Sequence, residues 1–186
     1  MGTSSNRRKA QLLSLRPDLE FADLRGNLQT RIQKLRDEKY DAIVLAKAGL
    51  TRIEMDLSDF HLEEISPVEV IPAPAQGVLA IQIRETDSDL FDLLQQLNDK
   101  DVAKTIAVER KVLNMFDAGC HAPLGCYCRE KDGKYEAWTS IADTNEDFPD
   151  RYYLQADTTE GMAEKIFAKY QKDRKLPSSV FISRDL

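Results

Sequence analysis

The chain lacks the sequence features of several large classes of protein. No apolar run approaches the about 20 residues that a helix needs to cross a bilayer, and the N-terminus shows no signal-peptide pattern. Only three cysteines occur, and this odd number, with two of them at Cys126 and Cys128, excludes a secreted disulfide framework. We therefore expect a cytoplasmic protein with reduced thiols that contacts no membrane.

A surplus of positive charge is also absent. Lysine and arginine number 26 against 32 aspartates and glutamates, which gives a net charge of −6 at pH 7. Because a general nucleic-acid-binding protein carries a basic surplus, we expect no nucleic acid as a partner. Hydrophobic residues make up 42% of the 186 residues, which is typical of a globular protein with one substantial core or two small ones. An anion-binding role would therefore depend on a local cluster of arginines.

Helix and strand patterns alternate in the first part of the chain. Residues 3–5 are good N-cap residues, and a helical pattern over residues 7–15 follows them. Residues 19–24 alternate as a strand, and residues 41–46 form a run typical of a buried strand. Helical spacing follows each of these runs. The order predicts a βα-alternating region up to about residue 75.

Arginines gather near the ends of these elements. Arg25 follows the first predicted strand, Arg31 lies on the next helix, and Arg52 follows the second predicted strand. The carboxyl ends of strands in open α/β sheets face the ligand crevice. Arg7 and Arg8 lie near a helix start, whose free backbone N–H groups suit a carboxylate or phosphate. Because the guanidinium fork matches a carboxylate at two points, the cluster predicts a ligand with many carboxylates; ordinary solvated charges are the alternative.

The rest of the chain predicts an antiparallel sheet with helices. A proline-rich stretch over residues 65–77 is typical of an extended crossing segment or hinge, and a strand pattern over residues 78–84 follows it. Asp132-Gly133 is a turn signal between two strand patterns. We expect helices over residues 87–97, 101–116 and 159–170, and strands over residues 124–129, 135–141 and 152–156. The predicted fold class is therefore α/β, followed by a small α+β unit with a three-stranded antiparallel sheet.

One thiol occupies a position suited to chemistry. Cys120 follows Gly119 in a tight turn between a helix pattern and a strand pattern, and Pro123 and Gly125 stiffen and then release the exit. A thiol in such a turn is presented to a cavity, which makes it a candidate for covalent modification. A small buried residue that closes a loop is the alternative.

A metal site is not indicated. Cys120, His121, Cys126 and Cys128 lie close in sequence, but their spacing is not a zinc pattern. We expect Cys126 and Cys128 to be packing residues on strands. His61 and His121 have no acid–base partner visible in the sequence, so a general-base role is unsupported. The aromatic residues expected in the core, rather than in a stacking platform, are Trp138, Tyr152 and Tyr153.

Taken together, these segments resemble the porphobilinogen deaminase (hydroxymethylbilane synthase) family along nearly the whole chain. Several specific motifs occur in the family's order, which makes chance a poor explanation for the similarity. The matching segments are Gly2-Thr3-Ser4-Ser5 with Arg7-Arg8, Arg25-Gly26-Asn27 with Thr30-Arg31, Tyr40-Asp41-Ala42-Ile43 with Ala48-Gly49-Leu50 and Arg52, Gln76-Gly77, Glu109-Arg110, and Gly119-Cys120 with Pro123 and Gly125.

The resemblance implies a transferase of tetrapyrrole (haem) biosynthesis. Such an enzyme condenses four porphobilinogen units stepwise, with release of ammonia, on a dipyrromethane cofactor that a thioether joins to a cysteine, here Cys120. The implied partners are porphobilinogen and the growing polypyrrole chain, with no metal. The implied fold of the first region is a partial periplasmic-binding-protein-like domain. The residues that the resemblance assigns to the cofactor are Thr3, Ser5, Arg7, Arg8, Arg25 and Arg31, and those that it assigns to the substrate are Arg25, Arg31, Arg52 and Gln76.

The chain departs from the family pattern in its extent. Family members carry an N-terminal domain before the Gly-Thr-Ser-Ser motif, and that domain supplies the aspartate that assists deamination, so no catalytic residue is assigned here. The resemblance divides the chain into a central ligand-crevice domain (1–75), a crossover strand and helix that belong to the missing domain (76–98), and a cofactor-cysteine domain (99–186). We expect a truncated form with little activity alone, or one that receives an N-terminal segment in trans. The alternative is a non-catalytic module that binds carboxylates or tetrapyrroles, or a structural fragment.

Overall fold

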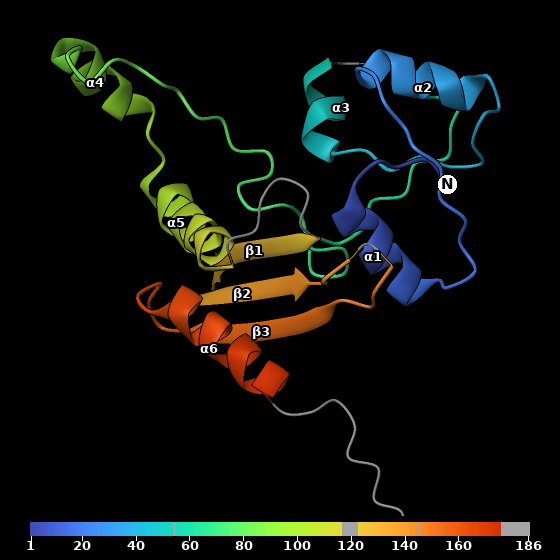
Figure 1. Cartoon of the computed structure of the whole chain (residues 1–186). Coiled ribbons are helices and arrows are strands. Elements are labelled where there is room, and N and C mark those ends of the chain that lie inside the picture. Colours follow the sequence, from blue (N-terminus) through green and yellow to red (C-terminus); the bar gives the residue numbers. More distant parts are fainter. Residues whose placement is uncertain (54, 117–122, 145, 176–186) are drawn as a thin grey trace, which may run out of the picture.

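The computed structural model describes residues 1–53, 55–116, 123–144 and 146–175, and Figure 1 shows their arrangement. The described chain is mixed, with helices throughout and strands in its second half. The helices are α1 (Asn6–Leu15), α2 (Leu28–Arg36), α3 (Lys47–Ile53), α4 (Ser88–Leu94), the short 3₁₀ helix η1 (Gln95–Leu97), α5 (Lys100–Met115) and α6 (Met162–Lys175). The strands are β1 (Leu124–Lys131), β2 (Lys134–Ile141) and β3 (Asp150–Ala156).

The second half contains the predicted three-stranded antiparallel sheet, in the order β1-β2-β3. Asp132 and Gly133 connect the first two strands, and both adopt positive φ, as a tight two-residue hairpin turn requires. Helices α5 and α6 cover one face of the sheet and bury its core (Figure 1). The buried core residues are Val108, Val112, Leu124, Cys126, Cys128, Ala137, Ile141, Tyr152, Met162, Ala163 and Ile166. The sheet, its two helices and the packing role of both described cysteines are therefore confirmed.

The two strands predicted in the first half are wrong, because each segment forms only one isolated β-bridge. Gly2 pairs in parallel with Ala22 on one side and with Ile43 on the other. The Gly2 N–H donates to the Ala42 carbonyl at 2.8 Å, and the Gly2 carbonyl accepts from the Val44 N–H at 3.3 Å. Because α1 begins at Asn6, the central segment turns away at once and the ladder cannot continue. The parallel order and the helices that follow each segment agree with the predicted βα alternation.

The strand predicted over residues 78–84 is also wrong. No strand of the described chain lies beside it, so its peptide groups have no ladder to join. The side chains of Leu79 and Ile81 are 76% and 61% exposed. Figure 1 shows this segment as a loop that leads away from the sheet toward α4. The predicted helix over residues 87–97 is present as α4 and η1, but its apolar side chains Leu90, Phe91, Leu93 and Leu97 are exposed.

Buried Ile71 lies at the junction between the two halves. The side-chain amide of Gln11 pairs with both peptide groups of Ile71: its Nε2 donates to the carbonyl at 2.9 Å, and its Oε1 accepts from the N–H at 2.7 Å. On the other side, Gly125 lies so close that an added Cβ would stand 2.6 Å from the Ile71 carbonyl oxygen. The Cys126 N–H donates to the Pro72 carbonyl at 3.0 Å. Helix α1 and strand β1 are therefore joined through Ile71.

Substitution of Gln11 tests this junction. Gln11→Leu should lower the free energy of unfolding by about 1–3 kcal/mol, because it leaves the buried Ile71 N–H without an acceptor. Urea denaturation measures the change. The control is Gln33→Leu, which removes an exposed bond to Asp37 and should alter stability by less than about 0.5 kcal/mol. Equal effects of the two substitutions would contradict the proposed role of Ile71.

Candidate anion-binding site

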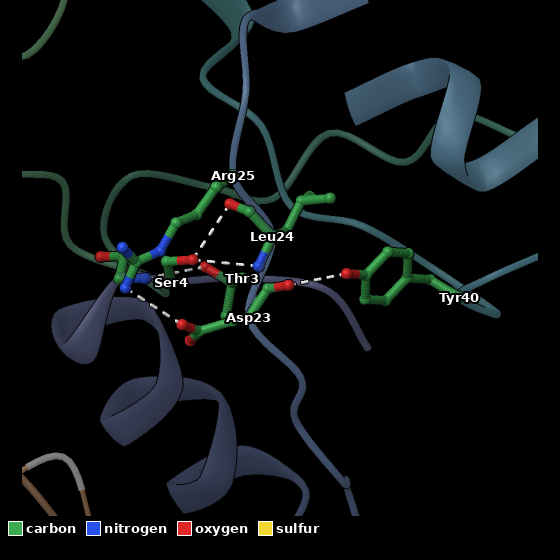
Figure 2. Close-up of polar contacts among 7 residues, drawn as sticks. Thr3, Ser4, Asp23, Leu24, Arg25 and Tyr40 are labelled. Atoms are coloured by element: carbon green, nitrogen blue, oxygen red, sulfur yellow. Dashed lines mark hydrogen bonds and ion pairs between the residues drawn. The ribbon is translucent and has the colours of Figure 1, made fainter. Parts of the chain in front are cut away.

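The start of α1 is held by three hydroxyl side chains. Ser5 is the N-cap, and its Oγ accepts from the Arg8 N–H at 3.4 Å. Thr3 is buried, and its Oγ1 accepts from the Ser5 N–H at 3.2 Å. Figure 2 shows Ser4 Oγ donating to the Leu24 carbonyl and accepting from the Leu24 N–H, at 3.0 and 2.9 Å. These bonds fix the helix start against the segment that leads to Arg25. A small hollow of about 70 Å³ beside them is lined by residues that include all three hydroxyls and Lys9.

Two arginines follow the cap, and both are largely removed from water. Arg7 is 9% exposed; it donates to the Ile71 carbonyl at 2.9 Å and to Gln76 Oε1 at 3.5 Å. Arg8 donates to the Val44 carbonyl at 2.8 Å. No carboxylate of the described residues forms an ion pair with either guanidinium. The charges of this pair are therefore uncompensated within the described part of the chain.

The electrostatic consequence appears in the pKa values of both arginines. Burial, with a smaller contribution from the Arg8 charge, lowers the pKa of Arg7 to about 10. Burial, with a contribution from the Arg31 charge, lowers the pKa of Arg8. Arg7 is still protonated at neutral pH, so its positive charge is held in a site where burial and the neighbouring Arg8 charge disfavour it. An anion that entered here would relieve that repulsion.

A cavity of about 1060 Å³ opens beside the two arginines. Gln76 and Gly77 of the crossing segment line it together with Arg7 and Arg8. Most of its other walls are apolar, among them Ile32 of α2. An apolar cavity with a few convergent polar groups is the usual form of a small-molecule site.

The other predicted arginines do not line this cavity. Arg31 donates to the Gly26 carbonyl at 2.8 Å, and its charge acts on Arg8. Arg52 donates to the carbonyl of Gly77 at 3.0 Å. Arg25 is exposed and bonded to Asp23 at 3.2 Å, as Figure 2 shows. The structure therefore brings together Arg7, Arg8 and Gln76, with Arg31 and Arg52 nearby and Arg25 turned toward a carboxylate.

The predicted cofactor cysteine, Cys120, and its neighbour His121 lie outside the described residues. Helix α5 ends at Met115 and β1 begins at Leu124, so the chain around Cys120 connects these two elements. Among the residues that the structure describes, no group of three His, Cys, Asp or Glu side chains could hold a metal ion. Burial raises the pKa of both Cys126 and Cys128 to about 12, so these thiols stay protonated.

Sequence reasoning gave no role to two polar residues that position the site, although Glu109 belongs to one of the segments that carry the family resemblance. Gln11 lies four residues after Arg7, on the same face of α1, and both side chains bond to the Ile71 carbonyl. Glu109 of α5 is 3% exposed; its carboxylate accepts from the Ala75 N–H at 2.6 Å and from the Cys128 N–H at 2.8 Å. Helical spacing from Arg7 could have indicated Gln11. The two backbone partners of Glu109 are far apart in sequence, and no local pattern reveals them.

Comparisons with known proteins decide the family. Residues 1–92 match the family model described as "Porphobilinogen deaminase, dipyromethane cofactor binding domain". The chain is also 46% identical over 134 residues to the porphobilinogen deaminase of Fusobacterium nucleatum, and 46% identical over 132 residues to that of Bacillus mycoides. The chain belongs to the porphobilinogen deaminase family.

The match to the porphobilinogen deaminases is partial in length. The two alignments cover 72% and 71% of this chain, but only 44% and 42% of the relatives. A further relative, from Bacillus cereus, is 47% identical over 68% of this chain and 41% of its own length. The chain thus spans less than half the length of these curated relatives. No helix among the described residues has the length and apolar character needed to cross a membrane.

The buried carboxyl of Glu109 predicts a pH dependence of stability. Burial raises its pKa above the ordinary 4.5, against the opposing effect of its two backbone donors. The folded protein therefore keeps this proton to a higher pH than the unfolded chain. As pH rises from 4.5 through the raised pKa, the parent should lose free energy of unfolding relative to Glu109→Gln.

Urea denaturation of both proteins between about pH 4 and pH 8 measures this difference. The free energy of unfolding of the parent should fall steadily with pH relative to that of the variant. A difference that is constant, or that grows with pH, would show that Glu109 ionises at least as easily in the folded protein as in the unfolded chain.

Proposed function

We propose that the chain is the anion-binding part of a hydroxymethylbilane synthase, a transferase of tetrapyrrole biosynthesis. Its substrate would be porphobilinogen, and its product a polypyrrole chain formed with release of ammonia. The observation that carries the proposal is the pair Arg7 and Arg8, two largely buried guanidiniums without a carboxylate partner among the described residues. Porphobilinogen carries two carboxylates on each pyrrole ring, so a growing chain needs many fixed cations.

The residues present fit a dipyrromethane cofactor. Each guanidinium has five N–H donors. Arg7 donates to one carbonyl oxygen and one amide oxygen, so further N–H groups remain for carboxylates. We propose that Cys120 holds the cofactor covalently and that the hydroxyls of Thr3 and Ser5 bond to it. When bound, the cofactor supplies the pyrrole position that accepts the first substrate unit. The proposed cofactor-binding arginines are Arg7, Arg8, Arg25 and Arg31, and the proposed substrate-binding residues are Arg25, Arg31, Arg52 and Gln76.

A partner segment would complete the site. We propose the domain division 1–75, 76–98 and 99–186, in which residues 76–98 pair with an N-terminal segment supplied in trans. Exposed Leu79 and Ile81 support this pairing, since an extended apolar run without a neighbouring strand favours strand addition. That segment would supply the catalytic groups, because no described residue combines a perturbed acid with the arginine pair. The free, buried thiols Cys126 and Cys128 support a reducing, cytoplasmic location.

A non-catalytic module that binds carboxylates is the second candidate. It is favoured by the observation that neither Arg7 nor Arg8 forms an ion pair with a carboxylate of the described residues, although Glu38, Asp41 and Glu63 line the same cavity. Porphobilinogen turnover separates the two candidates. A synthase converts porphobilinogen once an N-terminal segment is added, whereas a non-catalytic module binds porphobilinogen and never converts it.

Arg8 is the best residue for a test of the site. Arg7 also bonds to Ile71 and its loss would disturb the fold, while Arg8 has a single backbone contact. In the chain without the cofactor, porphobilinogen can place its own carboxylates at the cofactor arginines, so Arg8→Met should weaken porphobilinogen binding about ten-fold or more, as expected for loss of a charged hydrogen-bonding partner. Isothermal titration calorimetry measures this affinity.

The matched control is Arg16→Met, at the other end of the same helix. Arg16 is exposed and bonded to Asp18 at 2.6 Å, so its loss should leave binding unchanged. If Arg8→Met stays folded and binds porphobilinogen as tightly as the parent, the proposed site is wrong.

A further inference from the structure

The sheet has a second face, opposite the helices, that carries a row of aromatic side chains. Tyr127 of β1, Trp138 of β2 and Tyr153 of β3 are direct cross-strand partners in the register. The ring centroids of Tyr127 and Trp138 lie 5.9 Å apart in a stacked arrangement, and those of Trp138 and Tyr153 lie 5.2 Å apart. This finding corrects the expectation that Trp138 and Tyr153 belong to the core, since strand alternation places only Tyr152 there.

A cation lies directly over this aromatic row. The Arg129 guanidinium is 4.9 Å from the centroid of Trp138, and it ion-pairs with Glu136 at 2.9 Å. The Tyr153 hydroxyl donates to the other oxygen of Glu136 at 2.9 Å. Arg129 follows Tyr127 by two residues, so both side chains belong to the same face.

Only one end of this face is covered by the described chain. Arg151 donates to the Val68 and Glu69 carbonyls, and Gly125 lies against Ile71, so the crossing segment lies over that end of the sheet. Tyr153, further along β3, is 48% exposed. The aromatic row therefore begins beside the crossing segment and leads away from it.

The row is continuous with the candidate anion-binding site. Tyr127 lines the same cavity of about 1060 Å³ as Arg7 and Arg8. One end of the row thus opens into the cavity, and Arg129 provides the next cation beyond it. The rings of a ligand that extends out of the cavity on this side would contact Tyr127 first, and then Trp138 and the guanidinium of Arg129.

We propose that Tyr127, Trp138 and Arg129 form a subsite for the outer rings of a polypyrrole chain whose inner rings lie at Arg7 and Arg8. This inference rests on the proposed function and deepens it. Pyrrole rings are π systems that stack on tyrosine and tryptophan, and a carboxylate on such a ring would share the Arg129 guanidinium with Glu136. Short ligands fill only the arginine end, so the subsite acts on chains of several rings.

Fluorescence provides a direct readout, because Trp138 is the only tryptophan of the chain. The probe is biliverdin, a linear tetrapyrrole with carboxylates, and its affinity is measured by quenching of Trp138 emission. Tyr127→Leu should weaken biliverdin binding about three- to ten-fold, the effect of one lost aromatic contact. Porphobilinogen, a single ring held at the arginine end, should lose less affinity than biliverdin in the same variant when measured by calorimetry.

The matched control is Tyr135→Leu, a tyrosine on the same sheet that packs against the core on the opposite face. It should leave biliverdin affinity unchanged. The inference is overturned if the parent shows no saturable quenching, if Tyr127→Leu binds biliverdin as the parent does, or if Tyr135→Leu weakens binding equally. It is also overturned if a proline-rich peptide, and not biliverdin, is the ligand whose affinity depends on Tyr127.

The test is separate from that of the proposed function. Failure of the proposed function appears as unchanged porphobilinogen binding in Arg8→Met. Failure of the subsite appears as unchanged biliverdin binding in Tyr127→Leu while Arg8→Met still weakens porphobilinogen binding.

Discussion

The structure depends on how the buried peptide groups of Ile71 are satisfied. Its N–H and carbonyl have no strand or helix partner; the side chain of Gln11 takes both, and Arg7 adds a second bond to the carbonyl. A buried peptide group without a partner costs about 1–3 kcal/mol, so these side chains are committed to the junction. The helix that carries Arg7 and Arg8 is thereby fixed to the segment that crosses to the sheet.

This constraint explains why the arginine pair is held away from water. Gln11 and Arg7 bring α1 against the crossing segment, which buries the guanidinium of Arg7 and brings Gln76 beside it. Glu109 then ties the same segment to β1 through Ala75 and Cys128. The result is a cationic site built on rigid supports, and rigidity is what a site needs to hold a flexible polyanion in one position.

Local patterns predicted those parts of the fold that depend on local contacts. The hairpin at Asp132-Gly133, the alternation that buries Cys126 and Cys128, and the serine cap of α1 were all predictable, because each follows from a few neighbouring residues. The strands of the first half and the strand over residues 78–84 were not, because a strand exists only when another chain segment lies beside it. Their sequences have the correct pattern, but the described chain provides a single bridge in one case and no neighbour in the other.

The candidate site was predictable in composition and less so in geometry. Arg7, Arg8 and Gln76 line one cavity, whereas Arg25 is paired with Asp23. The role of Glu109 follows from contacts between distant segments, and single-sequence patterns do not contain that information. Helical spacing from Arg7 could have indicated Gln11, and strand alternation could have separated Trp138 and Tyr153 from Tyr152. The family resemblance ordered the motifs correctly, but it could not place them relative to one another.

The most direct test of the account is the intact mass of the chain, purified after co-expression with the N-terminal portion of the Fusobacterium nucleatum relative. The account predicts a mass increase equal to one dipyrromethane unit, absent in Cys120→Ser and retained in Cys128→Ser. An unmodified mass in the co-expressed parent, or an adduct that persists in Cys120→Ser, would contradict the claim that this chain holds the cofactor at Cys120.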